Sequence, residues 1–148
     1  MVDTAPAPEL SVVLPVFNEE GYLRRLLDEV LPVIRGLGRT FEVVFVDDGS
    51  RDRSPEVLRE LAAEHPEVVV WRLDRNHGLS SALDAGFRSA RGAVIVTLDA
   101  DLQNDPGDIP RLYALLGESD MVCGWRRDRV DPFVKRASSR VANWWRNL

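Results

Sequence analysis

Apolar and polar residues alternate along the chain in blocks that predict strands and helices in turn. Short, valine-rich apolar runs predict buried strands over residues 10–16, 41–46, 68–73, 93–98 and 121–124. Between these runs, apolar residues at helical spacing predict helices over residues 18–37, 54–65, 79–90 and 109–116, with a last helix from residue 132 onward. Such alternation through short connections is typical of βαβ units. The predicted fold class is therefore α/β, with a mostly parallel sheet covered by helices on both faces.

Residues at the ends of these segments predict how the helices begin and end. Asn18 is expected to cap the first helix, and Pro32 to kink or restart it. The run Ser54-Pro55-Glu56 favours a helix start, with a cap, a proline in the first turn and an acidic residue. The helix over residues 79–90 has small residues on one face, which would let it lie close to a sheet.

The length of 148 residues predicts one domain with a substantial core, spanning residues 10–131. Residues 1–9 are expected to form a flexible arm, and residues 132–148 a basic, tryptophan-containing helix. Cys123 is the single cysteine, so no internal disulfide is possible. The amino-terminal residues do not read as a signal peptide, and no stretch approaches the ~18 to 20 apolar residues of a membrane span. We therefore expect a cytoplasmic location.

The net charge of −5 is unevenly distributed. Residues 125–148 contain seven Lys and Arg and two Asp, a balance of +5, whereas residues 1–124 carry a balance of −10. An acidic body argues against nucleic-acid binding over the whole surface. The basic segment is compatible with a local anionic partner such as a phosphate or a membrane surface, and equally with a solvated basic helix.

Polar clusters follow the predicted strands at their carboxyl ends, the edge where open parallel sheets bind ligands. They are residues 17–19, 47–48, 75–78, 99–103 and 125–127. Because these loops should meet at one sheet edge, we expect them to form one site.

Asp99, Asp101 and Gln103 are the predicted metal ligands of this site. Residues i and i+2 share a face of a regular strand, so the two carboxylates would repel each other unless a cation lay between them. Oxygen ligands suit Mg²⁺ or Mn²⁺, and such an ion would bridge a diphosphate. The alternative is a polar turn in which Asp accepts from backbone N–H groups.

Asp47 and Asp48 end a second strand in the same way. One carboxylate could accept from a base or ribose while the other holds the turn, with Gly49 at positive φ. Glu19 is either a residue favoured by the helix dipole or a contact to a base. His77, before Gly78, is interpreted as structural rather than as a catalytic base.

The basic segment offers candidate phosphate ligands. They are Arg126, Arg127, Arg129, Lys135 and Arg136, since guanidinium forks match phosphate oxygens, and a solvated basic face is the preferred interpretation for Arg127 and Arg129. Two adjacent tryptophans, Trp144 and Trp145, are typical of a helix in a membrane interface. Packing against other parts of a larger protein would explain them equally well.

Five segments match a known family in order and spacing. They are residues 11–20 (SVVLPVFNEE), 46–50 (VDDGS), 75–78 with 85–87 (RNHG and AGF), 99–106 (DADLQNDP) and 124–126 (GWR). The chain resembles the inverting GT-A glycosyltransferases of family two, and within them the polyprenyl-phosphate branch with dolichol-phosphate mannosyltransferase and the bacterial undecaprenyl-phosphate sugar transferases.

The resemblance implies a GT-A, Rossmann-like fold and sugar transfer from a nucleotide diphosphate to a polyprenyl phosphate with inversion. A UDP-sugar is favoured over a GDP-sugar by the run after Trp125. The cofactor would be Mg²⁺ or Mn²⁺, and the protein would lie peripherally on the cytoplasmic face of the membrane through its carboxyl-terminal helix. The implied nucleotide-sugar contacts are Pro15, Phe17, Glu19, Val46, Asp47, Asp48, Asp99, Arg126 and Lys135; the implied catalytic pair is Asp99 and Asp101, and the metal ligands are Asp99, Asp101 and Gln103.

Two features of the chain depart from the family pattern. Relatives usually carry Phe or Tyr where His77 stands, and they continue past the position of Leu148 with an acceptor-side half. A non-catalytic nucleotide-sugar-binding remnant is therefore the alternative hypothesis. A haloacid-dehalogenase-type phosphatase or a receiver-type domain fits less well, because neither accounts for residues 99–103 together with the other motifs.

Overall fold

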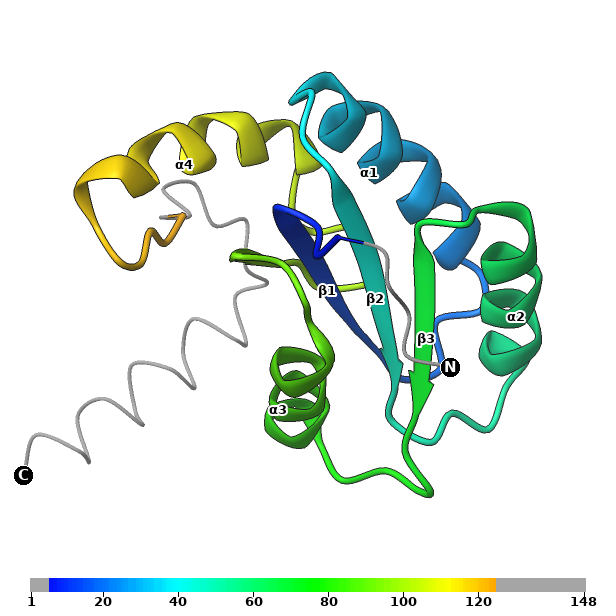
Figure 1. The fold of residues 1–148 in the computed structure, drawn as a ribbon. Helices are drawn as coiled ribbons and strands as arrows, with labels where there is room; N and C mark the ends of the chain where they lie inside the picture. Colours follow the sequence, from blue (N-terminus) through cyan, green and yellow to red (C-terminus); the bar gives the residue numbers. More distant parts are fainter. Residues whose placement is uncertain (1–5, 125–148) are drawn as a thin grey trace, which may run out of the picture.

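The computed structural model describes residues 6–124 of the chain. Strands and helices alternate as the sequence predicts (Figure 1). The order is β1 (Leu10–Val16), α1 (Leu23–Gly36), β2 (Phe41–Asp47), α2 (Ser54–Glu64), β3 (Val68–Arg72), α3 (Leu79–Ser89), β4 (Val94–Thr97), a 3₁₀ turn (Pro106–Asp108), α4 (Ile109–Leu115) and a second 3₁₀ turn (Leu116–Glu118).

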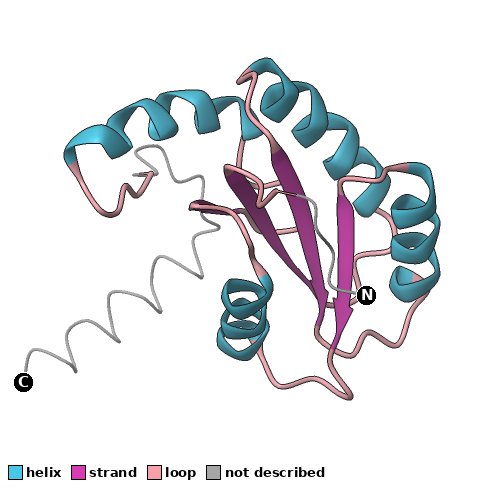
Figure 2. Cartoon of the chain, viewed as in Figure 1, coloured by secondary structure: helices cyan, strands magenta, loops and turns pink. Residues whose placement is uncertain are grey.

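The four strands form one parallel sheet in the order β3-β2-β1-β4. Helices α1 and α2 lie on one side of it and α3 on the other, as Figures 1 and 2 show. In the register, Val16 at the end of β1 pairs with Asp47 at the end of β2. The loops that follow the strands therefore emerge at one edge. The predicted α/β class, with a parallel sheet covered on both faces, is confirmed.

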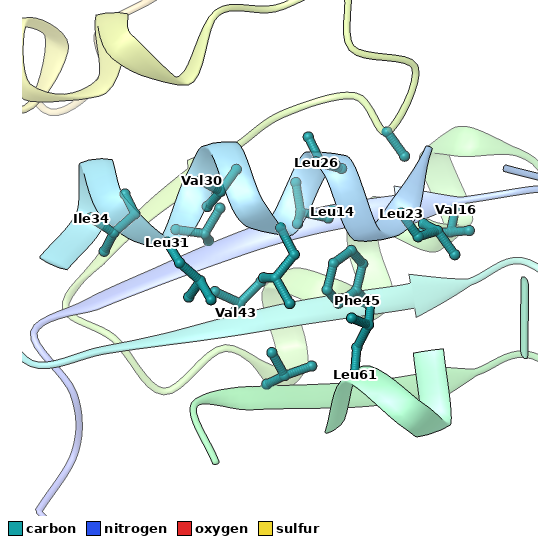
Figure 3. Packing of buried hydrophobic residues seen from close by; sticks show 14 of the residues in the cluster. Leu14, Val16, Leu23, Leu26, Val30, Leu31, Ile34, Val43, Phe45 and Leu61 are labelled. Carbon is teal, nitrogen blue, oxygen red and sulfur yellow. The ribbon is translucent and has the colours of Figure 1, made fainter. Parts of the chain in front are cut away.

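The larger core lies between the sheet and α1 (Figure 3). Helix α1 is amphipathic, and its apolar stripe, spaced three and four residues apart, is buried against inward-facing strand residues such as Leu14 and Phe45. The stripe consists of Leu23, Leu26, Leu27, Val30, Leu31 and Ile34. Each of these side chains, when fully buried, contributes about 1.5–3 kcal/mol to folding.

The opposite face of the sheet has a smaller core, formed by Val13, Val44, Val46 and Ala82. Here α3 approaches closely because Gly86 faces the strands: a Cβ at this position would lie 2.4 Å from Cγ1 of Val13. The expected close approach of a helix with small residues is confirmed.

Three local predictions are wrong. Residues 121–124 form no strand: Met121 is 77% exposed, and a four-residue apolar run without a paired neighbour has no hydrogen-bonded ladder to join. Asn18 does not cap α1, whose first turn follows Tyr22. Ser54 does not cap α2, because Arg53 stands at the N-cap position and Ser54 is the first residue of the helix. Pro32 lies inside α1 on its exposed face, where water can solvate the carbonyl that lacks its N–H partner, so the helix does not restart there and the kink stays a prediction.

A buried carboxylate links the segments that meet at the amino-terminal ends of the strands. Glu42 on β2 is 3% exposed, and its Oε1 accepts from the Ser11 hydroxyl at 2.6 Å and from the Arg91 N–H at 2.7 Å. Its Oε2 accepts from Arg91 Nε at 3.0 Å, and Ser11 Oγ in turn accepts from the Gly92 N–H at 2.8 Å. Burial acts to raise the pKa of Glu42, but the bonds from Ser11 and Arg91 outweigh it and lower the pKa overall.

We expect Glu42→Gln to lower the free energy of unfolding by about 1–3 kcal/mol near neutral pH, because an amide –NH₂ would face the Arg91 guanidinium or its N–H. Since the folded-state pKa is lowered, the contribution of the carboxylate is complete above the unfolded-state value of about 4.3 and is lost as pH falls through the folded-state value. In urea unfolding between pH 7 and pH 3, the difference in the free energy of unfolding between wild type and variant should therefore become smaller as the pH falls. A constant difference would contradict this assignment.

The expectations that concern Arg126, Lys135, Trp144, Trp145 and the helix over residues 132–148 lie outside the described residues. The division into arm, domain and final helix stays a prediction. Strand β1 begins at Leu10 as expected, and Glu9 before it is held by the Thr40 N–H and by Arg39. Among the described helices, none is long and apolar enough to span a membrane.

Candidate functional site

A cleft of about 440 Å³ opens at the carboxyl edge of the sheet. The loops after β1, β2 and β4 and the loop that leads into α3 all contribute to it, so four of the five predicted polar clusters meet here. The fifth, at residues 125–127, lies outside the described residues. The lining residues are Pro15, Val16, Phe17, Glu19, Asp48, Asn76, Gly78, Leu79, Ala82, Asp99, Ala100 and Asp101.

The cleft has an apolar wall and an acidic rim. Phe17 is 40% exposed and Leu79 57% exposed, and both side chains line the cleft. A flat ring could lie against such a wall. Leu79 and Ala82, in the first turn of α3, were not predicted as site residues; their position directly after the polar loop 75–78 is the signal that could have identified them.

The acidic rim consists of Glu19, Asp48, Asp99 and Asp101, and the described lining residues include no Lys, Arg or His. Glu19 has a raised pKa, first because burial penalises its charged form and then because Asp101 and Asp52 are close. An anionic phosphate group would therefore be repelled from this rim unless a cation accompanied it.

Asp99 and Asp101 lie beyond the strand, because β4 ends at Thr97. The prediction that they share one face of a regular strand is therefore wrong. Ala100 between them is 4% exposed and packs into the larger core, which anchors the turn. Leu102 follows at a φ of +58°, a left-handed conformation that is rare for a bulky residue and costs about 1–2 kcal/mol.

Hydrogen bonds define this turn further. Asp101 Oδ1 accepts from the Gln103 N–H at 3.0 Å, and Asn104 Nδ2 donates to Asp99 Oδ2 at 3.3 Å. Asp101 thus stabilises a turn, as the alternative interpretation expects, and it also lines the cleft; its role as a metal ligand stays a prediction. Gln103 is exposed and is not among the lining residues.

The donor atoms at the rim fit a hard divalent cation, because all are carboxylate oxygens. Within residues 6–124, no three His, Cys, Asp or Glu side chains are grouped closely enough to hold an ion by themselves. Mg²⁺ is commonly bound by one or two carboxylates together with substrate phosphates, so a rim with two neighbouring carboxylates is compatible with an ion that also contacts a diphosphate.

Asp47 has a structural position beside the site. It is fully buried, and its Oδ1 accepts from the Ser50 N–H at 2.9 Å. Arg72 Nε lies 3.1 Å from its Oδ2, close enough for an ion pair but without the alignment of a hydrogen bond. Val46 is also fully buried, and neither side chain lines the cleft. The expectation that one of the two adjacent aspartates holds the turn thus agrees with the geometry.

Asp48 lines the cleft and also holds the loop before α3. Its Oδ1 accepts from the His77 N–H at 2.7 Å and its Oδ2 from the Gly78 N–H at 2.8 Å. Asn76, which lies in this loop, lines the cleft as well. His77 Nε2 contacts Asp74 Oδ1 at 2.6 Å, and the His77 side chain is not part of the lining, which agrees with a structural role.

Comparison with known proteins identifies the family. The sequence profile described as "Glycosyl transferase family 2" matches residues 11–147, which is most of the chain. The chain belongs to glycosyl transferase family 2. Two similar family members are undecaprenyl-phosphate 4-deoxy-4-formamido-L-arabinose transferases. The one from Edwardsiella ictaluri is 46% identical over 137 residues, and the one from Pseudomonas paraeruginosa is 48% identical over 141 residues.

These alignments cover 90% and 93% of the chain but only 42% and 41% of the two relatives. The chain thus spans less than half the length of the family 2 relatives it matches. Residues 11–147, which match the family profile, include the lining of the cleft with Asp99 and Asp101.

Solved structures support the GT-A fold of this family 2 chain. A mannosyltransferase from Pyrobaculum calidifontis, solved with GDP-Man and Mn²⁺, aligns with a TM-score of 0.63 and 26% identity over 77% of this chain and 34% of its own. Glucosyl-3-phosphoglycerate synthase from Mycobacterium tuberculosis, solved with Mn²⁺, UDP and phosphoglyceric acid, gives 0.60 and 26% over 76% of this chain and 40% of its own. Both of these neighbours were therefore solved with Mn²⁺ and a nucleotide.

Proposed function

We propose that this chain binds the nucleotide-diphosphate sugar of an inverting glycosyltransferase, a UDP-sugar in preference to a GDP-sugar, and that the acceptor is a polyprenyl phosphate. The observation that carries the proposal is the cleft itself, in which an apolar wall faces a rim of four carboxylates without a basic residue among the described lining. A base fits the wall, and a diphosphate with a divalent cation fits the rim. The names of the family 2 relatives support the acceptor class.

The proposed roles follow from position. Phe17, Pro15 and Leu79 would contact the base and ribose, with Asp48 and Glu19 as acceptors at the edge of that pocket. Asp99 and Asp101 would hold Mg²⁺ or Mn²⁺ together with the diphosphate. A cation held there would supply Lewis-acid stabilisation of the departing nucleotide diphosphate. Gln103 as a ligand, Val46 and Asp47 as donor contacts, and Arg126 and Lys135 as phosphate contacts stay predictions.

The reaction would be a single displacement. An oxygen of the acceptor phosphate attacks the anomeric carbon, the bond from that carbon to the diphosphate oxygen breaks, and the electron pair leaves with the nucleotide diphosphate. A phosphate monoester already carries about 1.5–2 negative charges at pH 7, so no side chain has to remove a proton from the nucleophile. The described residues then act by binding and orienting the donor, which agrees with a lining that contains no His.

Calorimetric titration tests donor binding. We expect UDP-arabinose to bind the purified chain in the presence of MnCl₂ at least about tenfold more tightly than after treatment with EDTA, because the rim repels an uncompensated diphosphate. GDP-mannose under the same conditions tests the preference for uridine. Binding without any metal dependence, or no binding of either donor, would contradict the proposal.

The second candidate function is binding of the donor without transfer of the sugar. The chain spans 41–42% of the length of the aligned relatives. Incubation with a donor and a short-chain polyprenyl phosphate separates the two functions, since transfer yields a glycosylated lipid that mass spectrometry detects.

The proposed peripheral location at the cytoplasmic membrane face is tested by co-sedimentation with anionic vesicles.

A further inference from the structure

The loop after β1 and the loop after β2 are joined by reciprocal hydrogen bonds at Asn18. The Asn18 N–H donates to Ser50 Oγ at 2.9 Å, and Asn18 Oδ1 accepts from the Arg51 N–H at 2.8 Å. Backbone and side chain of one residue thus bind the neighbouring loop in both directions. Ser50 is only 3% exposed, so its bond is shielded from water.

The next two residues are also bonded to this segment, Glu19 through its N–H and Glu20 in both directions. The Glu19 N–H donates to Ser54 Oγ at 2.9 Å, and Ser54 is fully buried. The Glu20 N–H donates to Asp52 Oδ2 at 3.1 Å, while Glu20 Oε2 accepts from the Arg53 N–H at 2.7 Å. We call these five bonds between residues 18–20 and residues 50–54 the loop clasp.

Two residues of the loop clasp, Asn18 and Glu20, flank Glu19 in the sequence but do not themselves line the cleft. Asn18 lies between Phe17 and Glu19, which both line the cleft. Asn18 has a φ of +57°, in the left-handed region that Asn tolerates better than most residues. This conformation turns the chain between the apolar wall at Phe17 and the acidic rim at Glu19, and the bonds to Ser50 and Arg51 hold the turn in place.

We propose that Asn18 is a positioning residue for the donor, acting through the loop clasp on Phe17 and Glu19. The inference rests on the proposed function, because it assigns a role in binding a nucleotide-diphosphate sugar. Without the side-chain acceptor at residue 18, the Arg51 N–H loses its partner and the turn that carries Phe17 and Glu19 loses one of its attachments. Ordering this turn then becomes part of the cost of binding the donor.

The test compares Asn18→Gly with Asn18→Asp. Glycine keeps the left-handed backbone accessible and removes the acceptor, whereas Asp keeps an acceptor oxygen of similar geometry. We expect Asn18→Gly to bind UDP with Mn²⁺ about fivefold more weakly than wild type, and Asn18→Asp to restore affinity to within about twofold. Amide hydrogen exchange at Arg51 should accelerate in Asn18→Gly alone.

The two proposals fail in different ways. If wild-type protein binds neither UDP nor a UDP-sugar with Mn²⁺, the proposed function is wrong. If wild type binds and Asn18→Gly binds equally tightly, the positioning role of Asn18 is overturned, even where the melting temperature of the variant is lower. Equal weakening in Asn18→Gly and Asn18→Asp also overturns it, because the acceptor oxygen would then be irrelevant.

A second pair of variants gives the same test if Asn18→Gly does not fold. Glu20→Gln keeps an acceptor for the Arg53 N–H and Glu20→Ala removes it, and Glu20 does not line the cleft. We expect weaker UDP binding only in Glu20→Ala. Equal affinities of the two Glu20 variants would overturn the role of the loop clasp.

Discussion

Asp101→Asn should reduce the Mn²⁺-dependent affinity for a nucleotide-diphosphate sugar by about 100-fold or more. Loss of groups that merely support a metal ligand already costs about 10–100-fold, and Asp101 is itself a proposed ligand. The substitution is selective, because the amide oxygen of Asn can still accept from the Gln103 N–H and so preserve the turn. Isothermal titration with UDP-arabinose, with and without MnCl₂, measures the change.

Asp105→Asn is the matched control. Asp105 Oδ1 accepts from the Gly107 N–H at 2.8 Å, the same i to i+2 arrangement as at Asp101, but Asp105 does not line the cleft. We expect this variant to retain the affinity and metal dependence of wild type. Equal losses in both variants would show that the carboxylates act on the local turn, and an unchanged Asp101→Asn protein would remove Asp101 from the metal site.

Gly49→Ala should destabilise the fold by about 3 kcal/mol and weaken donor binding at the same time. Gly49 has a φ of +69°, and a Cβ here would lie 2.4 Å from the carbonyl carbon and 2.6 Å from the Cα of Arg75. Backbone atoms cannot swing aside as a side chain does, so the loop over residues 74–78 would have to move. That loop includes Asn76 and Gly78 of the cleft wall, and Asp48 holds it through two hydrogen bonds.

Gly38→Ala separates the two causes of this loss. Gly38 has a similar φ of +64°, but a Cβ there would meet no atom within 4 Å. Its expected loss of about 1–2 kcal/mol is the cost of a left-handed residue alone. Urea unfolding of both variants measures the difference. If Gly49→Ala lost no more stability than Gly38→Ala, the contact with Arg75 would not constrain the loop.

The β2–α2 loop has a larger role in the cleft than its sequence motif suggests. Asp48 holds the wall at residues 76–79, and the residues from Ser50 to Ser54 hold the turn at residues 17–20 through the loop clasp. The two parts of the proposed donor pocket at residues 17–20 and at residues 76–79 are therefore both attached to the β2–α2 segment. Changes in this segment should affect donor affinity even where the altered side chain does not touch the donor.

The order of elements was predictable because each follows from local chemistry. The apolar run at residues 10–16 coincides with β1, and the spacing of apolar residues in α1 matches its buried face. Parallel connectivity then implies that the loops at residues 17–19, 48, 76–78 and 99–101 share one sheet edge, as the cleft confirms. Long periodic segments and chain connectivity are thus readable without knowledge of long-range contacts.

Other features depend on partners that are distant in sequence. The apolar run at residues 121–124 has the composition of a strand, but a strand also requires a paired edge. Asn18 has the chemistry of a helix cap, yet it bonds Ser50 and Arg51, more than 30 residues away. Likewise, composition alone could not separate Asp47, which is buried in a turn, from its neighbour Asp48, which reaches the cleft.

By itself, therefore, the sequence determined the α/β class, the strands and helices of its periodic segments, and the sheet edge at which the polar loops gather. These features were readable because hydrophobic periodicity and parallel connectivity act locally. Only the tertiary structure decided which carboxylates line the cleft, that Leu79 and Ala82 complete its wall, that Asn18 joins two of its loops by hydrogen bonds, and that Gly49 lets the loop at Arg75 approach closely. The reason is physical: hydrogen-bond partners and close backbone contacts depend on the distances between loops, and these distances exist only once the sheet has assembled.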